Sequence, residues 1–262
     1  MSGSHLKLQI YGNVATVTLN RPEKRNALSR ELLSELSEAL FDLHQEKRVG
    51  AVILTGSGEA FSAGIDLGEI VSSTEENSQP APDWGRDAEQ LVDLILQMLQ
   101  FPKPIIAAVN GPALASGAGL VLACDLAIGS EAATIGFPET RRGLVGGIVA
   151  PLLVFRIGGA SAGYLLMTAE SIDAQAAHRL GLLQEITKDE QLWARANELA
   201  GICTRGAPEA LKLTKSVLNE TIGEEPSTML SAGAEATANA RTTEAATEGV
   251  KAFLEKCPPK WP

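Results

Sequence analysis

The sequence contains few residues that bind metals or form cross-links. Of its 262 residues, three are cysteine and three are histidine. The cysteines, Cys124, Cys203 and Cys257, are far apart and include no C-x-x-C pair, so neither a disulfide framework nor a zinc site is expected. The histidines have no metal-site spacing and no matching nucleophilic serine. We therefore expect no metal and no Ser–His hydrolase, and a reducing compartment.

Basic residues and long apolar runs are also scarce. Lys and Arg total 22 against 32 Asp and Glu, a net charge of -10 at pH 7. Nucleic-acid binding usually needs a dense basic surface, so nucleic acid is not an expected partner. No segment has the roughly 18 uninterrupted apolar residues of a membrane span. Residues 1–7 resemble neither a secretory signal nor a transit peptide, which makes the cytoplasm the expected location.

Strand patterns dominate the first part of the chain. Residues 6–10 and 15–19 alternate apolar and polar around a Gly-Asn turn, which predicts a β-hairpin. Short apolar runs at 51–55, 105–109 and 124–129 predict further strands. The chain is long enough to bury a large core behind such a sheet.

Helical patterns dominate the last third. One helix is predicted from the N-cap Ser29 to about Arg48, and an amphipathic helix carries Leu91 to Leu99 after a polar stretch, 72–86, expected to be a mobile loop. Further helices are predicted at 146–157, 161–168, 189–204, 208–220, 228–243 and 245–256. The prediction is an α/β fold, with a core over 1–195 and a helical region over 196–262 for docking and oligomerisation.

Two small-residue loops each follow a predicted strand, at 60–67 (AFSAGIDL) and 110–119 (NGPALASGAG). Such loops can present free backbone N–H groups, and the start of a helix favours negative charge. Neither loop has the G-x-x-x-x-G-K-[ST] or G-x-G-x-x-G phosphate pattern. Taken alone, each is explained at least as well by tight packing.

The order of several motifs resembles the enoyl-CoA hydratase/isomerase (crotonase) family. The matching segments are 19–28 (LNRPEKRNAL), 63–67 (AGIDL), 107–111 (AAVNG), 123–125 (ACD), 136–139 (GFPE), 143–145 (GLV) and 253–256 (FLEK), followed by two prolines and Trp261. The resemblance covers nearly the whole chain. It implies a spiral of strand-strand-helix units and an enzyme of fatty acid metabolism that acts on an unsaturated acyl-CoA thioester.

The resemblance also implies catalytic roles. The backbone N–H groups of Ile65 and Ser116 would form an oxyanion hole for the thioester carbonyl as it becomes an enolate. Fixed donors in a dry site stabilise developing charge, and loss of one typically costs about 2.7–4 kcal/mol of barrier. Glu139 coincides with the family's acid/base glutamate. An apolar lining that includes Phe137 would raise its pKa toward neutrality, which favours proton transfer.

Recognition of coenzyme A is implied for one five-residue segment: Ala63, Gly64, Ile65, Asp66 and Leu67. Lys24 and Arg25 are candidates for the phosphates, and Phe253 and Lys256 are candidates supplied by another subunit. A solvated surface charge explains the basic residues equally well. The family typically forms a homotrimer or a hexamer of two trimers. No cofactor is expected beyond coenzyme A as part of the substrate.

Aspartates beside turns have a further interpretation. Asp66 and Asp125 stand at family positions next to turn residues, where an aspartate side chain commonly accepts hydrogen bonds from the backbone. That capping role is the more economical prediction for both.

Gly119 marks a departure from the family pattern, because family hydratases usually carry a second glutamate there. Two glutamates orient and activate water, whereas double-bond isomerisation needs only one, and the pair Glu139-Thr140 is similar to that of family isomerases. Hydration stays open, since Glu139 could act alone or with a carboxylate such as Asp83 or Asp87.

Other functions on the same scaffold also stay open. An acyl-CoA decarboxylase or thioesterase would use the oxyanion hole differently, and a noncatalytic acyl-CoA binding protein would bind without turnover. Acyl chain length and branching depend on pocket shape and are not predicted.

Overall fold

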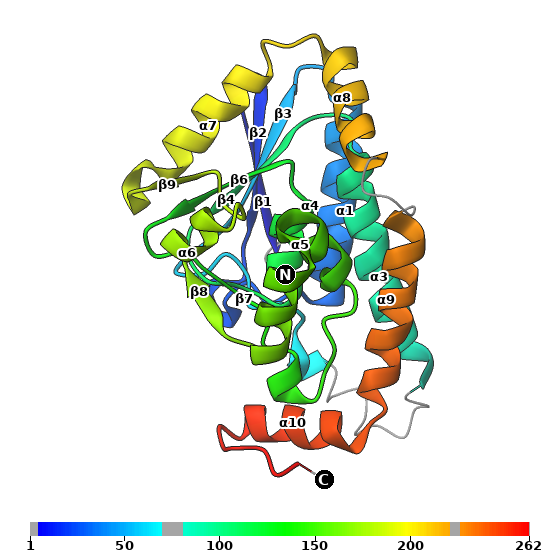
Figure 1. Ribbon diagram of the computed structural model, residues 1–262. Coiled ribbons are helices and arrows are strands. Elements are labelled where there is room, and N and C mark those ends of the chain that lie inside the picture. The colour runs from blue at the N-terminus through cyan, green and yellow to red at the C-terminus, as the bar shows by residue number, and fades with distance from the viewer. Residues whose placement is uncertain (1–4, 70–80, 221–225, 262) are drawn as a thin grey trace.

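A six-stranded sheet forms the centre of the computed structural model, which describes residues 5–69, 81–220 and 226–261 (Figure 1). Its order is β1 (Leu6–Tyr11), β2 (Val14–Leu19), β3 (Ala51–Gly56), β4 (Ile105–Val109), β6 (Leu126–Ser130) and β9 (Glu185–Thr187). The first two strands form the predicted antiparallel hairpin, and each later neighbour pairs in parallel. A smaller sheet contains β5 (Ala113–Leu114), β7 (Thr134–Gly136) and β8 (Ser171–Asp173).

Helices cover both faces of the large sheet. On one face lie α1 (Arg30–Gln45) and α3 (Ala81–Gln100), which pack on each other. On the other face, α7 (Leu192–Cys203) buries Leu192, Ala196 and Ala200 against strand residues. Alternate side chains of a strand point to opposite faces, so the strands feed two separate clusters of buried side chains.

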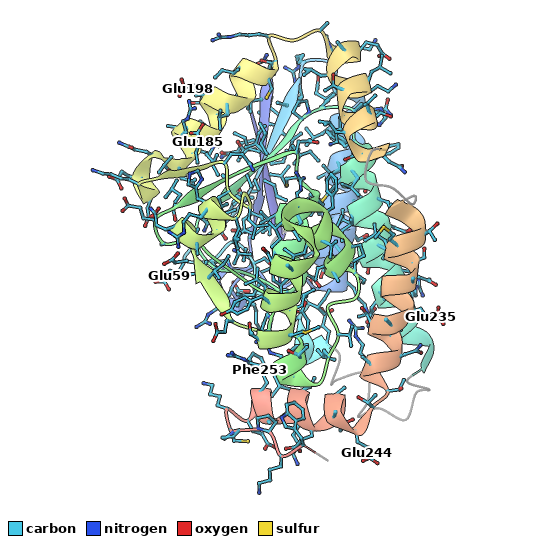
Figure 2. All side chains as sticks on the ribbon, viewed as in Figure 1. Glu59, Glu185, Glu198, Glu235, Glu244 and Phe253 are labelled. Carbon is cyan, nitrogen blue, oxygen red and sulfur yellow. The ribbon has the colours of Figure 1, made fainter. Side chains whose placement is uncertain are left out.

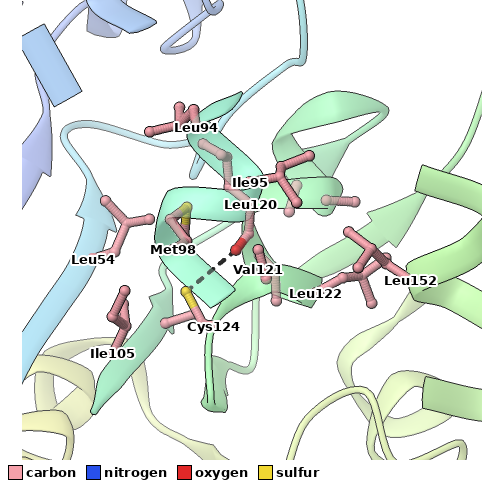
Figure 3. Close-up of a cluster of buried hydrophobic side chains, with 14 of the residues drawn as sticks. Leu54, Leu94, Ile95, Met98, Ile105, Leu120, Val121, Leu122, Cys124 and Leu152 are labelled. Atoms are coloured by element: carbon pink, nitrogen blue, oxygen red, sulfur yellow. Dashed lines mark hydrogen bonds between the residues drawn. The ribbon is translucent and has the colours of Figure 1, made fainter. Parts of the chain in front are cut away.

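The larger cluster joins the sheet to the helices beside the two loops. Figure 3 shows Leu54 of β3 and Ile105 of β4 in the same cluster as Met98 of α3. The cluster continues through Leu120 of α4 (Ser116–Ala123) to Leu152 of α5 (Val149–Thr168). This close packing gives the loops that begin α4 a rigid support.

The C-terminal helices dock on the core of their own chain. They are α8 (Pro208–Glu220), α9 (Pro226–Arg241) and α10 (Glu244–Leu254). Of these, α9 packs against α3 and α5, whereas α10 crosses one end of the molecule beside the short helix η2 (Thr140–Arg142) (Figure 1). The expected division between residues 1–195 and 196–262 stays a prediction. The helices after residue 195 pack closely on the segments before it.

Most predicted elements are confirmed, including the cap of α1, where the Ser29 hydroxyl accepts a hydrogen bond from Leu32 N at 3.2 Å. The expected loop is wrong from residue 81 onward, because α3 begins there; residues 72–80 lie outside the described part. Two predicted helices merge as α5, which bends at Gly158 (φ 75°, ψ 160°). The short β7, β8 and β9, and α6 (Ala174–Arg179), were not predicted.

Helix α5 is long and apolar enough to cross a membrane, with 20 residues and a mean hydropathy of 1.5. It is nevertheless a bent helix that packs on α4 and α9 and buries Leu153, Ala162 and Leu165 in the core. Only 28% of its apolar window is buried, so one side of α5 packs on the core and other apolar side chains of the helix stay exposed.

Lys215 attaches α8 to the core, and its removal should destabilise the fold. Its ammonium donates to Met98 O at 2.9 Å and to Asp125 Oδ2 at 2.8 Å, while Asp125 also caps Ile105 N. Lys215→Met leaves the half-buried carboxylate of Asp125 without its cation, so we expect a loss of about 1–3 kcal/mol in urea unfolding. Lys212→Met, on the exposed side of the same helix, is the control, and equal losses in both variants would contradict this role.

Candidate functional site

A cavity of about 700 Å³ opens between the two small-residue loops and the C-terminal helices. It brings together residues far apart in the sequence, from η1 (Pro22–Lys24) near one end of the chain to the residues after α10 near the other. Every predicted site residue except Gly64 lines it, namely Lys24, Arg25, Ala63, Ile65, Asp66, Leu67, Ser116, Glu139, Phe253 and Lys256.

Asn26 holds the first loop in place from below. Its side chain is fully buried and donates to Ala60 O at 2.8 Å and to Ser57 O at 2.9 Å. The backbone carbonyl of Asn26 accepts a hydrogen bond from the Ser62 hydroxyl at 2.8 Å. Segment 19–28 is thus the support on which the first loop rests.

Arg21 holds the other end of the same loop. Its guanidinium donates to Ala27 O at 2.6 Å and pairs with Asp66 Oδ2 at 3.0 Å. The second carboxylate oxygen of Asp66 accepts from Gly68 N at 3.1 Å, so the capping role predicted for this aspartate is confirmed. Sequence reasoning missed Arg21, and its only signal was its position in the segment at 19–28.

Two backbone N–H groups on the neighbouring loops are unpaired. On either side of Ile65, Gly64 O accepts from Leu28 N and Asp66 N donates to Leu28 O, whereas Ile65 N donates to none of the residues in 5–69, 81–220 and 226–261. Ser116 N, in the first turn of α4, likewise has no acceptor in that part of the chain. Both residues line the cavity, so it has two free donors in one wall.

Gly64 allows the two loops to meet. It has a φ of 88°, and a Cβ placed there would lie 2.9 Å from Leu114 O and 3.4 Å from Ser116 N. Any larger residue would therefore push the second loop away. The absence of a side chain at this position keeps the two unpaired donors on adjacent strands of backbone.

Glu139 is the buried carboxyl among the acidic residues that line the cavity. It follows β7, caps η2, and is only 9% exposed, with the fully buried Phe137 two residues before it. Burial raises the pKa of its carboxyl to about 7, although its own backbone N–H and the nearby Arg142 oppose the shift. Its Oε2 has no hydrogen-bond partner among the described residues. At neutral pH this carboxyl can both take and give a proton.

The other lining carboxylates are less suited to proton transfer. Asp87, which the sequence offered as a second acid, accepts two hydrogen bonds from Arg30 at 2.6 and 3.0 Å. Asp66 pairs with Arg21, and Glu23 is exposed. The side chain of Asp83 lies outside the described part.

The end of α10 completes the cavity. Phe253 lies on α10 (Figure 2), and the guanidinium of Arg142 sits 4.3 Å from the centre of its ring. Lys256 follows in a left-handed conformation (φ 56°) and also lines the cavity. The chain's own helix brings both residues to the site, so a second subunit is not needed to supply them.

One group of potential metal ligands lies outside the cavity lining, formed by His5, Glu31 and Glu35 within 4.8 Å of one another. Glu31 is exposed and the other two are partly so. Exposed acidic groups often gather without a metal, and we assign no metal site to this group.

The comparison with known families decides the classification. The profile described as "Enoyl-CoA hydratase/isomerase" matches residues 9–262. The chain belongs to the enoyl-CoA hydratase/isomerase family. The predicted family, fold class and enzyme class are thereby confirmed.

Known relatives and solved structures agree with this membership. A Thermus thermophilus protein with a provisional enoyl-CoA hydratase name is 40% identical over 95% of this chain and 98% of its own. The short-chain-enoyl-CoA hydratase of Clostridium acetobutylicum is 33% identical over 98% and 97%. The carnitinyl-CoA hydratase of Mycobacterium avium has a TM-score of 0.84 and 34% identity, with 99% of both chains covered.

Val149 packs beside Gly119. Gly119 is the position at which the family resemblance implies a second glutamate in hydratases. A Cβ on Gly119 would lie 2.7 Å from Val149 Cγ1, and Val149 itself lines the cavity and is 2% exposed. The position therefore has an apolar neighbour that leaves no room for a longer side chain. In this member of the enoyl-CoA hydratase/isomerase family, Glu139 faces the cavity without a second glutamate from α4.

The raised pKa of Glu139 should make stability depend on pH. Between the ordinary value of 4.5 and about 7, the folded protein holds a proton that the unfolded chain has lost, so stability falls as pH rises through this window. Glu139→Gln removes this dependence. Its free energy of unfolding relative to wild type should rise by about 2–4 kcal/mol between pH 4 and pH 8.

Urea unfolding at a series of pH values measures this difference. The matched control is Glu235→Gln, an exposed carboxylate on α9 that points away from the core (Figure 2). Its difference from wild type should stay flat with pH. A flat difference for Glu139→Gln as well would show that its carboxyl is not desolvated.

Proposed function

We propose that this protein binds an unsaturated acyl-CoA thioester and moves its double bond through an enolate. The observation that carries the proposal is the meeting, in one cavity, of two unpaired N–H groups, at Ile65 and Ser116, with the desolvated carboxyl of Glu139. The donors suit an oxygen that gains negative charge, and the carboxyl suits a carbon that loses a proton.

The thioester carbonyl accepts from Ile65 N and Ser116 N. Neither donor has to break a bond within the described protein to reach it, so the stabilisation of the enolate oxygen costs little reorganisation. The helix dipole of α4 adds to this effect, because Ser116 lies in the first turn.

Glu139 carries the proton. In its charged form it takes a proton from carbon 2 of a 3-enoyl thioester, and the electrons of that C–H bond move toward the carbonyl oxygen. The same carboxyl then returns the proton to carbon 4, which yields the conjugated 2-enoyl thioester and restores the carboxylate. A pKa near 7 suits both transfers.

Isomerisation fits the cavity better than hydration. It needs one carboxyl, and a Glu139 beside an apolar Val149 supplies one. Hydration is the second candidate, because relatives such as the Clostridium acetobutylicum protein are named hydratases. It would require Glu139 alone to activate a water held by backbone groups.

The remaining parts of the proposal concern binding and assembly. Lys24, Arg25 and Lys256 line the cavity and offer positive charge to the phosphates of coenzyme A. The expected homotrimer or hexamer and the cytoplasmic location stay predictions. Exposed apolar side chains on α5, at Phe155, Tyr164 and Met167, favour assembly.

A paired assay tests the reaction. The purified protein is offered 2-enoyl-CoA and 3-enoyl-CoA esters of equal length, and products are identified by mass and absorbance. We expect the 3-enoyl ester to become conjugated without a change in mass, and Glu139→Gln to lower the rate by about 100-fold or more. Glu23→Gln, which changes an exposed carboxylate of the same lining, should keep most of the activity.

Other products would replace the proposal. A gain of one water on the 2-enoyl ester, lost in Glu139→Gln, would identify a hydratase. Release of CoA from a saturated ester would identify a thioesterase, and loss of carbon dioxide from a malonyl-type ester a decarboxylase. Tight binding without any turnover would identify a noncatalytic binding protein.

Val149 should limit what a second glutamate can do. Gly119→Glu alone forces a side chain against Val149 Cγ1, so we expect a loss of about 1–3 kcal/mol and no gain in water addition. The double change Gly119→Glu with Val149→Ala removes the clash. It should recover stability and raise the rate of hydration of a 2-enoyl-CoA above that of wild type.

Val149→Ala alone is the control, because a wider cavity without the added carboxyl should not raise hydration. Suppose that Val149→Ala and the double variant are both stably folded and hydrate the 2-enoyl-CoA at equal rates. That result would show that a glutamate at position 119 does not control water addition.

A further inference from the structure

Arg241 places a positive charge in the wall of the cavity. It is the last residue of α9, lines the cavity, and is only 6% exposed. Its Nε and Nη1 are shielded from solvent and have no hydrogen-bond partner in the described part of the chain. Buried guanidinium groups are normally hydrogen-bonded, so these two nitrogens can donate to a ligand that enters the cavity.

The nearest carboxylate does not supply that acceptor. Asp87 Oδ2 is 3.8 Å from Arg241 Nη1, beyond hydrogen-bond length, and both of its oxygens already accept from Arg30. Arg30 and Arg241 both approach Asp87, and Arg30 occupies both of its oxygens. Burial lowers the pKa of Arg241, Asp87 opposes this, and the charge of Arg30 lowers it again. An anion that entered the cavity would offset the desolvation of the Arg241 guanidinium.

A short series of contacts leads from Arg241 to the carboxyl of Glu139. It begins at Thr237, which lies one helical turn before Arg241 on α9. Thr237 Oγ1 is 3.4 Å from Val145 O. A Cβ on the adjoining Gly146 would in turn lie 3.4 Å from the carboxyl carbon of Glu139. Arg241 and Glu139 line the same cavity of about 700 Å³, which has room for an acyl chain between them.

These observations rest on the proposed function and narrow its substrate class. We propose that the acyl group ends in a second carboxylate, which pairs with Arg241 while the thioester end lies beside Glu139. The substrate is then the CoA monothioester of a short unsaturated dicarboxylic acid. Arginine suits this role, because its fork of N–H donors matches a carboxylate.

A phosphate of coenzyme A is the other possible source of an anion. Lys24, Arg25 and Lys256 already offer three basic side chains to the phosphates. Asp87, Ala88 and Leu91 of α3 line the cavity together with Arg241, and their mostly apolar character suits an acyl chain. The position of Arg241 therefore favours the acyl carboxylate, and binding measurements separate the two sources.

Binding of three unreactive probes tests the proposal without requiring turnover. By calorimetry, wild type should bind glutaryl-CoA at least about 10-fold more tightly than its terminal methyl ester, which has nearly the same shape without the charge. Arg241→Met should abolish this preference and leave the affinities for the methyl ester and for free CoA within about 3-fold. Arg241→Lys keeps the charge and should keep part of the preference.

Arg30→Met is the matched control. It removes the other arginine from Asp87, yet Arg30 does not line the cavity, so the preference for the free acid should remain. If Arg241→Met weakened free CoA as much as glutaryl-CoA, Arg241 would serve a phosphate and the proposal would be overturned. An unchanged preference in a folded Arg241→Met protein would also overturn it.

Kinetics distinguish this inference from the proposed function. Turnover of hex-3-enedioyl-CoA should exceed that of its methyl ester in kcat/KM, and Arg241→Met should equalise the two. Turnover of neutral esters alone, unaffected by Arg241→Met, would leave the proposed function standing and refute the dicarboxylic substrate. A preference seen in binding without any turnover would refute the isomerase while supporting the role of Arg241.

Discussion

The close approach of Gly64 to the first turn of α4 is the contact on which the site depends. It requires a glycine with a φ of 88° and a first loop held from below by Asn26. If the loops moved apart, the unpaired N–H groups of Ile65 and Ser116 would no longer share one wall of the cavity. The buried hydrogen bonds of Asn26 join segment 19–28 to the first loop and so fix the backbone of that loop.

The second constraint is the burial of Glu139. The same burial that raises the pKa of its carboxyl to about 7 lowers the stability of the folded protein at neutral pH. Val149 lines the same cavity, and Phe137 is fully buried two residues before Glu139. The rest of the core, including the helices that pack on the sheet, supplies the stability that such a group removes.

Much of this was readable in the sequence, and the limits have physical causes. The order of the segments from 19–28 to 253–256 indicated the family. Alternation located β1 and β2, helical spacing located α1, and short apolar runs located β3 and β4. The three-residue strands β7 to β9 were too short for a period to show. Likewise, Val149 beside Gly119, and Arg241 beside Asp87, meet only through tertiary packing, which leaves no trace in local sequence.

The dependence of the cavity on Phe253 and Lys256 has a consequence for biosynthesis. A ribosome makes these residues after all the described strands and after Glu139. A nascent chain can therefore fold its central sheet while the cavity still lacks one wall. Partial chains that stop before α10 therefore contain every described strand and still cannot form the whole cavity wall.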